Sequence, residues 1–422
     1  MKLLAKIKAQ AMQFAILISV LVALILSAFL LLTHVHSFFK IKSKEVIFAF
    51  EQSNKQLFES LETTTTTTDT ITITEENHTV KQSVDYHGSW LKRYVGIDIH
   101  NQAVSRIAYT GAALTDKTPN LYIEDTNSPI VVVGNTRLEG NSYLPKQGIK
   151  AGTISGTYYQ GTNLYYGRAI ESNAKLPDFS PEWLQYLENS TQGALLENGN
   201  LIPIKKELTN SFQNTIQILY DTSAIFLGDE KITGNIVVQS DTKITIGAAT
   251  QLTDVLLIAP EIIIHDRVKG RFQCIATKKI KVGAYSQLYY PSSLILLDQK
   301  KPTENTQNNT LQQPDFEIDT GTMIQGSIAY LIKKQETNRN RIKTNMAIAP
   351  NVRITGEVYC RGNIDFQGII MGSLYAKQCI ARQSGSIYLN HIFNGKVLIN
   401  PIDDYAGLPF KNTKHTVAKW LY

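Results

Sequence analysis

The chain has few of the residues that cross-link small folds or bind metals. Its 422 residues include only 3 cysteines, at positions 274, 360 and 379. Because this number is small and odd, no disulfide framework holds the fold, and the cysteines are better explained as buried thiols than as one disulfide and a spare. The 8 histidines show neither an HExxH motif nor another metal-ligand spacing, and none lies beside a cysteine pair. We therefore predict no metal site.

Motifs for phosphate binding and nucleophilic catalysis are missing as well. The sequence contains no GxxxxGK[ST] loop, no dinucleotide fingerprint after a strand and no GxSxG elbow. The net charge of +6 is small for this length and does not demand a nucleic-acid partner. We expect a protein that is not an enzyme, with no catalytic residues, no cofactor and no nucleic acid among its partners.

One long apolar run is present near the N-terminus. Residues 11–33 contain no charged side chain. At about 1.5 Å per residue, such a helix is long enough to cross a hydrocarbon core of about 30 Å. A buried core helix is one alternative, and a cleaved secretory signal is another. Signals have a shorter apolar region and a small-x-small cleavage site, which this run lacks, so we favour an uncleaved transmembrane anchor.

Lysines flank the run on both sides and leave its orientation nearly balanced. They are Lys2, Lys6 and Lys8 before it, and Lys40, Lys42 and Lys44 after it. Long C-terminal domains translocate largely regardless of charge. We therefore expect residues 1–10 to be a cytoplasmic leader of a single-pass protein in the inner membrane. The C-terminal bulk would lie in the periplasm or be exposed outside.

The helix is predicted to continue beyond the span as a stalk over residues 34–62. Apolar residues at helical spacing predict one apolar face, made of Val46, Ile47, Phe50, Leu57, Phe58 and Leu61. Such a face packs either against the globular part of the same chain or against neighbouring subunits. The threonines at 63–68 then stop the helix, because β-branched residues in series favour extended chain.

A β-rich domain is predicted over residues 70–230. Alternating apolar residues predict a small antiparallel sheet from 70 to about 107, and short strands separated by glycines follow from 121 to 166. One helix interrupts them at 181–189, because Ser180 can cap it, Pro181 suits its first position and Glu182 its first turn.

Residues 231–398 carry a repeat that predicts a β-solenoid. Gly356, Val358, Tyr359, Cys360 and Ile364 align at a shift of 16 residues with Gly372, Leu374, Tyr375, Ala376 and Ile380. Further copies are predicted at Gly326–Tyr330 and Gly385–Leu389, at Ile258–Ile264 against Ile275–Val282, and at Val238–Ile246. Each turn would stack on the next and bury its Ile and Val side chains. An ordinary β-sandwich is the alternative.

Two polar segments and a tail complete the predicted organisation. Residues 299–315 read as a polar loop between repeats, and the basic residues 333–343 as a second, solvated loop or a contact for an anionic partner. Residues 399–422 are expected to form a C-terminal tail.

Acidic side chains provide the only candidates for catalysis. Asp98 and His100 share a face of a predicted strand, where they read as two solvated polar residues without a nucleophile. Solenoids can carry polysaccharide hydrolases or lyases, and the candidate acids for such chemistry are Glu261, Asp266, Glu357 and Asp365. Because these four do not recur at the repeat step, no acidic ladder is expected.

Two families are similar to parts of this chain. The glycine-led repeats at 356–397 resemble those of bactofilin-type β-helices. The first sixty residues, with a basic leader at Lys6–Ala9, an apolar span and a helix continuing outward, resemble pilin-like subunits of secretion and pilus machines. That resemblance implies cleavage by a prepilin peptidase before the span, although Ala9 stands where the family has Gly and Phe14 where it has Glu. The whole chain is also similar in style to envelope proteins of Bacteroidetes.

Together these observations predict a membrane-anchored structural or assembly protein of the cell envelope. Its concrete version is a pilin-like accessory subunit whose stalk helix contacts other envelope or pilus subunits. The alternative is a protein that binds or degrades carbohydrate with a solenoid face, with cell-wall or surface polysaccharide as its partner.

Overall fold

The structure is a computed structural model that describes residues 9–62, 67–75, 78–100, 102–299, 313–332, 343–399 and 405–422. It is mainly β-structure with one long N-terminal helix, as the sequence predicts. The chain divides into two compact units. The first comprises Met1–Phe58, Thr70–Gln82 and Val95–Arg106, and the second comprises Glu59–Asp69, Ser83–Tyr94 and Ile107–Tyr422. Most of the predicted loops at 299–315 and 333–343 lies outside the described residues.

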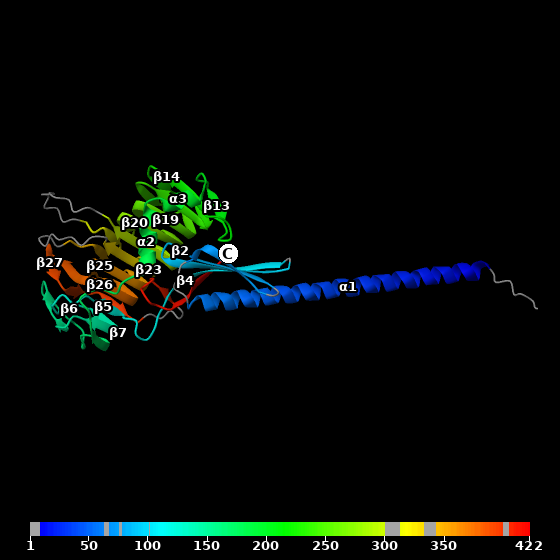
Figure 1. Cartoon of the computed structure of the whole chain (residues 1–422). Coiled ribbons are helices and arrows are strands. Elements are labelled where there is room, and N and C mark those ends of the chain that lie inside the picture. Colours follow the sequence, from blue (N-terminus) through cyan, green and yellow to red (C-terminus); the bar gives the residue numbers. More distant parts are fainter. Residues whose placement is uncertain are drawn as a thin grey trace, which may run out of the picture. The chain divides into compact units, whose positions relative to one another are not determined.

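The first unit is built around helix α1, which spans Ala9–Ser60 without interruption (Figure 1). The helix contains neither Gly nor Pro and is rich in Ala, Leu and Ile, so nothing in its sequence breaks it. The predicted span and stalk are therefore one continuous element. The unit also contains most of β1 (Thr67–Thr74) and parts of β2 (Thr79–His87), β3 (Trp90–Ile99) and β4 (Gln102–Ala113).

Strands β1 to β4 form the predicted small sheet, in the order β1-β2-β3-β4. Only Gly88 and Ser89 separate β2 from β3, and a connection this short joins antiparallel strands. In the second unit, the sheet is completed by β30 (Ala406–Gly407) and β31 (His415–Leu421), which both pair antiparallel with β4. The segment that the sequence suggests is a tail therefore contains two paired strands.

A parallel stack of strands makes up most of the second unit. Its members from β12 to β21 are β12 (Asn200–Leu201), β13 (Glu207–Asn210), β14 (Gln217–Asp221), β15 (Ile225–Leu227), β16 (Lys231–Gly234), β17 (Ile236–Ser240), β18 (Lys243–Ile246), β19 (Gln251–Ile264), β20 (Lys269–Val282) and β21 (Gln287–Asp298). Those that follow are β22 (Phe316–Ile318), β23 (Met323–Ile332), β24 (Met346–Ile348), β25 (Arg353–Phe366), β26 (Ile369–Gln383) and β29 (Lys396–Leu398). The pairings of the stack form one closed path that also includes β27, β5, β7 and β11.

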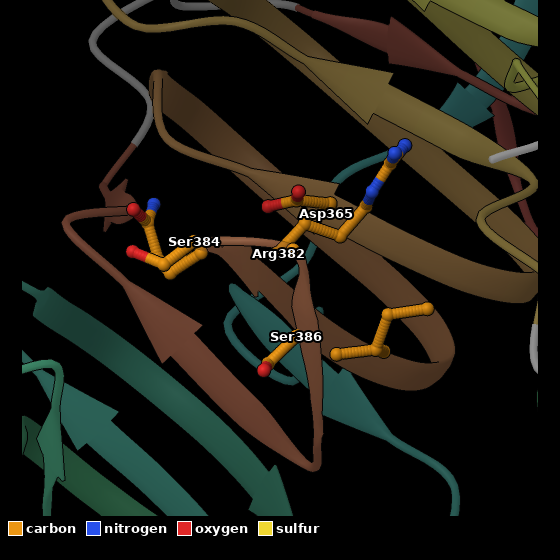
Figure 2. A pocket seen from close by; sticks show the side chains of 7 residues that line it. Asp365, Arg382, Ser384 and Ser386 are labelled. Atoms are coloured by element: carbon orange, nitrogen blue, oxygen red, sulfur yellow. The ribbon is translucent and has the colours of Figure 1, made fainter.

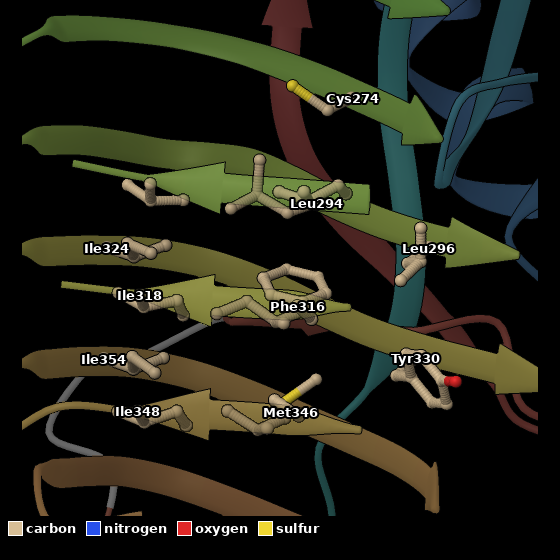
Figure 3. Close-up of a cluster of buried hydrophobic side chains, with 14 of the residues drawn as sticks. Cys274, Leu294, Leu296, Phe316, Ile318, Ile324, Tyr330, Met346, Ile348 and Ile354 are labelled. Atoms are coloured by element: carbon tan, nitrogen blue, oxygen red, sulfur yellow. The ribbon is translucent and has the colours of Figure 1, made fainter. Parts of the chain in front are cut away.

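The predicted repeat register is confirmed over most of the stack. Ile258 pairs with Ile275 and Ile262 with Ile280, while Gly326, Gly356 and Gly372 lie opposite one another on β23, β25 and β26. Side chains at equivalent positions therefore form inward rows in the core. Figure 3 shows three such rows, in which the paired residues are Ile324 with Ile354, Ile318 with Ile348, and Phe316 with Met346.

Two details of the predicted register are wrong. Ile364 lies opposite Cys379 and not Ile380, because an irregularity between Cys360 and Asn363 shifts the pairing by one residue. The copy beginning at Gly385 is not a further parallel turn either. Strand β27 (Ser386–Leu389) pairs antiparallel with β26, because Ser384 and Gly385 both have positive φ (50° and 80°) and form a two-residue hairpin turn.

Strands from earlier in the sequence extend the stack beyond β26. These are β5 (Leu121–Ile123), β7 (Arg137–Leu144) and β11 (Tyr166–Glu171), with β6 (Ile130–Val133), β8 (Ile149–Ala151), β9 (Thr153–Ile154), β10 (Thr157–Tyr158) and β28 (His391–Phe393) beside them. Strand β5 pairs with β26, β7 pairs with both β5 and β29, and β11 pairs with β7. Figure 1 shows β5, β6 and β7 next to β26.

A second apolar cluster covers one outer face of the stack. Helix α2 (Pro181–Thr191), with α3 (Ala194–Asn198) after it, is the predicted helix, and the Ser180 side chain accepts from the Trp183 N–H at its start. Trp183 and Leu187 are completely buried and share the cluster with Ile275 and Tyr359 from the stack. Fully burying a large apolar side chain stabilises a fold by about 1.5–3 kcal/mol, so this helix is firmly held.

Candidate functional site

The described side chains in the first half of helix α1 are exposed. The described side chains from Ala11 to Lys40 are all exposed, and the helix is long and apolar enough to cross a membrane. Large apolar side chains such as Phe29 and Leu30 are 69% and 71% exposed. A soluble chain rarely exposes so continuous an apolar surface, so this half of the helix needs an apolar environment.

The later part of α1 contacts the strands of its own unit through aromatic rings. The Phe48 and His78 rings meet edge to face, with their centroids 5.3 Å apart. The Arg106 guanidinium lies 4.0 Å from the centroid of the Phe50 ring, in a cation–π contact. These contacts join the helix to residues that precede β2 and lie in β4.

Polar contacts hold the same part of the helix. Gln82 on β2 donates to Gln56 at 2.9 Å, and the His100 Nδ1 lies 3.1 Å from the Glu45 Oε1. His100 does not meet Asp98, which pairs instead with Lys81 on β2 at 2.7 Å. The two residues predicted to be solvated on one strand therefore have different partners, Glu45 on α1 for His100 and Lys81 on β2 for Asp98.

The buried face of α1 differs from the predicted apolar stripe. Ala49, Ser53 and Leu57 are completely buried, four residues apart along the helix. Of the residues predicted for the stripe, Leu57 alone is buried, and the exposed ones are Val46, Ile47, Phe50 and Phe58. The prediction failed because it ranked positions by hydrophobicity, whereas small side chains allow the closest approach of a helix. Val46 and Ile47 thus remain exposed beyond the predicted span.

The four candidate acids lie in four different environments in the second unit. Glu261 stands in register between Lys243 and Lys279, and Asp266 accepts the Ala284 N–H at 2.9 Å in a turn. Glu357 is buried against the backbone of Leu408, and Asp365 lines a pocket. As predicted, these acids do not form a row along the stack.

The Asp365 pocket is the best candidate for chemistry among these sites (Figure 2). It has a cavity of about 330 Å³ and lies at the β26–β27 hairpin, lined by Arg382, Ser384 and Ser386 among others. Burial raises the pKa of Asp365 to about 6, and a hydrogen bond from the Arg382 backbone and the Arg382 charge offset part of that effect. A protonated carboxyl of this kind is suited to donate a proton at mildly acidic pH.

A second carboxylate is missing from that pocket. Asp365 is the only acid among the described residues that line it. Glycoside hydrolysis generally requires a pair of carboxylates on either side of the bond that breaks. The pocket therefore has a possible proton donor without the base or nucleophile that a hydrolase would need.

The cysteines and histidines do not assemble into a reactive site. Cys274, Cys360 and Cys379 are free and buried, and burial raises the pKa of each thiol, so they are inert at neutral pH. Within the described ranges, no group of three or more His, Cys, Asp or Glu side chains is placed to hold a metal ion.

The residues around Asp365 could not have been found by sequence reasoning. Arg382, Ser384 and Ser386 surround it because β26 turns back on itself at Gly385, where the sequence repeat predicts a further parallel turn. Comparison of the chain with protein-family models, with curated proteins and with solved structures gives no match.

Proposed function

We propose that this chain is a non-catalytic, membrane-anchored structural or assembly subunit of the cell envelope, of the pilin-like kind. One observation carries the proposal: α1 is a single helix of 52 residues whose first half is exposed and apolar, while its later part is joined to the strands of its own unit. At about 1.5 Å per residue this helix is about 78 Å long, which exceeds the thickness of a hydrocarbon core more than twofold.

A continuous helix gives the anchor a mechanical role. Because no Gly, Pro or loop separates the apolar half from the packed part, the strands are attached to the anchor by a rigid element. The exposed apolar residues Val46 and Ile47 lie beyond the predicted span, where water would otherwise surround them. Helices of neighbouring envelope or pilus subunits are the partners that we propose for this surface.

The parallel stack supports a head of β-solenoid type. From β17 to β21 and from β25 to β26, its strands repeat at steps of 15 to 20 residues, and their inward rows form one core. Such a head would present extended surfaces to partners, including cell-wall polymer. We place the anchor in the inner membrane with the head in the periplasm or outside.

The mature N-terminus tests the proposal. The chain would be expressed together with a prepilin peptidase and its N-terminal peptide analysed by mass spectrometry. We expect a chain that begins at Gln10 and carries an N-methyl group. An Ala9→Gly variant should be cleaved at least as well, whereas Ala9→Leu should remain intact as the matched control. Retention of Met1 in both the natural chain and the Ala9→Gly variant would remove the pilin-like assignment.

A further inference from the structure

A second cavity, of about 200 Å³, lies where the ends of the sequence-distant strands β7, β11 and β29 come together in the second unit. Charged, aromatic and amide side chains line it, and they include Asn135, Arg137, Tyr159, Gln160, Tyr166 and Lys396. This cleft contains no described carboxylate among its lining residues. Its chemistry therefore differs from that of the Asp365 pocket.

Two cations face each other across adjacent strands in this cleft. Lys396 on β29 and Arg137 on β7 are register partners in a parallel pairing. Neighbouring strands are about 4.8 Å apart, and like charges directly opposite one another destabilise a sheet. Arg137 is compensated by Glu139, whose Oε1 accepts from its Nε at 2.6 Å, but no described carboxylate forms an ion pair with Lys396. A bound anion would relieve this repulsion.

A contact with the Tyr166 ring orients Arg137, one of the two cations. The Arg137 guanidinium lies 4.3 Å from the centroid of the Tyr166 ring, and the Tyr166 hydroxyl lies 3.0 Å from the Thr162 hydroxyl. Tyr159 is half-buried, and its hydroxyl donates to the Asn163 carbonyl at 2.5 Å. The site is thus organised before any ligand enters, which lowers the entropy cost of binding.

We propose that this cleft binds the carboxylate-bearing ring of an acidic saccharide, such as a uronic acid residue of a polysaccharide. Lys396 and Arg137 would bind the carboxylate, since charged hydrogen bonds are the strong ones. The amides of Asn135 and Gln160 can both donate to and accept from sugar hydroxyls. The Tyr159 ring supplies an apolar surface for the C–H face of the sugar.

Size and composition favour a saccharide over an acidic peptide. Pockets for drug-sized ligands measure roughly 300–1,000 Å³, so a smaller cleft suits a single ring of a longer chain. An acidic peptide could use the cations and the amides, but its carboxylate side chains carry no ring to lie against Tyr159. This site deepens the proposed function, because it rests on the proposal that the head contacts cell-wall polymer and names the chemistry of that contact.

Calorimetric titration of the full chain in detergent micelles tests the inference. The probes are tetramers of galacturonate, glucuronate and mannuronate, the methyl ester of the galacturonate tetramer, and pentaglutamate. We expect saturable binding of at least one uronate, with affinity lower by about tenfold or more for the neutral ester. Lys396→Met and Arg137→Gln should each weaken binding by a similar factor.

Lys269→Met is the matched control. Like Lys396, Lys269 is the first residue of a strand of the stack; Lys269 is exposed and Lys396 is half-exposed. It should leave binding unchanged, and circular dichroism should show that all three variants fold. The proposal is overturned if no uronate binds at millimolar concentration, if the ester binds as well as the acid, or if Lys396→Met binds normally. Tighter binding of pentaglutamate than of every uronate would replace the saccharide by an acidic peptide. None of these results depends on how the N-terminus is processed.

Discussion

Replacing Glu357 by Gln should change how the stability of the second unit depends on pH. Glu357 lies on β25 and is only 2% exposed. Its Oε2 accepts the Leu408 N–H at 2.5 Å, and its own N–H donates to the Tyr405 hydroxyl at 3.1 Å. The glutamate therefore joins the stack to the segment that contains β30. In a Glu357→Gln variant the amide oxygen can still accept the Leu408 N–H, so the packing is retained while the charge is lost.

The size of the effect follows from the pKa of the carboxyl. Burial raises the pKa of Glu357 from 4.5 to about 7, although the Leu408 hydrogen bond lowers it in part. The folded state therefore binds more protons than the unfolded state between about pH 4.5 and 7, and stability falls as pH rises through that range. Since one pKa unit corresponds to about 1.4 kcal/mol, the loss from this residue amounts to about 3 kcal/mol by pH 8.

Urea unfolding of the full chain in detergent, followed by near-ultraviolet circular dichroism between pH 4.5 and 8, measures this loss. We expect the Glu357→Gln variant to gain about 3 kcal/mol relative to the natural chain as pH rises across the range. Glu197→Gln, at an exposed position of α3, controls for the general loss of a negative charge. Parallel stability profiles for the natural chain and Glu357→Gln would refute the reasoning, because they would show that the buried carboxyl does not titrate in this window.

Three further changes test the anchor, the stack and the end of α1. Ile25→Lys should reduce the fraction of protein that resists carbonate extraction from membranes, since a charge at the centre of a span costs about 2.5–3.5 kcal/mol; an unchanged fraction would contradict a membrane span. Gly356→Ala should lower the free energy of unfolding by about 2–4 kcal/mol, because Gly356 has a φ of +137° and a Cβ there would lie 2.0 Å from the Gly326 carbonyl oxygen. A thermal melting temperature equal to that of the natural chain would contradict this strain. Arg93→Met should cost about 1–3 kcal/mol in urea unfolding, because the buried Arg93 donates to the Ser60 carbonyl at the end of α1 at 2.5 Å and to the Thr110 hydroxyl at 3.1 Å. Recovery in Arg93→Lys would assign the loss to a charged donor at this position, and unchanged unfolding of Arg93→Met would contradict it.

The strand register could be predicted because neighbouring strands of the stack repeat the same local pattern. Val358 and Leu374 occupy the same position after a glycine on two paired strands, and each strand needs an inward apolar residue there. The spacing of apolar residues in the sequence therefore predicts the pairing. The prediction fails at Ile364, where an irregularity adds a residue on one strand, and at Gly385, where a glycine-led segment turns back as a hairpin. Both exceptions depend on backbone conformation, which a hydrophobic pattern does not record.

The extension of the stack by β5, β7 and β11 could not be predicted from the sequence. No local feature near Leu121 identifies Leu374 as its partner, because any apolar strand could pair with the same edge of β26. The pairing depends on long-range packing within the second unit. Loop closure over such a separation costs entropy that only the completed core repays.

This long-range junction determines where a binding site can exist. Arg137 and Lys396 become neighbours only because β7 docks on β29 at the end of the stack, and neither residue is distinctive in its own sequence context. The inward residues of the junction, Leu138 and Val397, are completely buried. A cavity-forming Leu138→Ala change would cost about 2–5 kcal/mol and should weaken the cationic cleft first, while α1 keeps its apolar half intact. Loss of uronate binding with unchanged membrane extraction would show that the anchor and the cleft are energetically separate. Simultaneous loss of both would show that they fold as one cooperative structure.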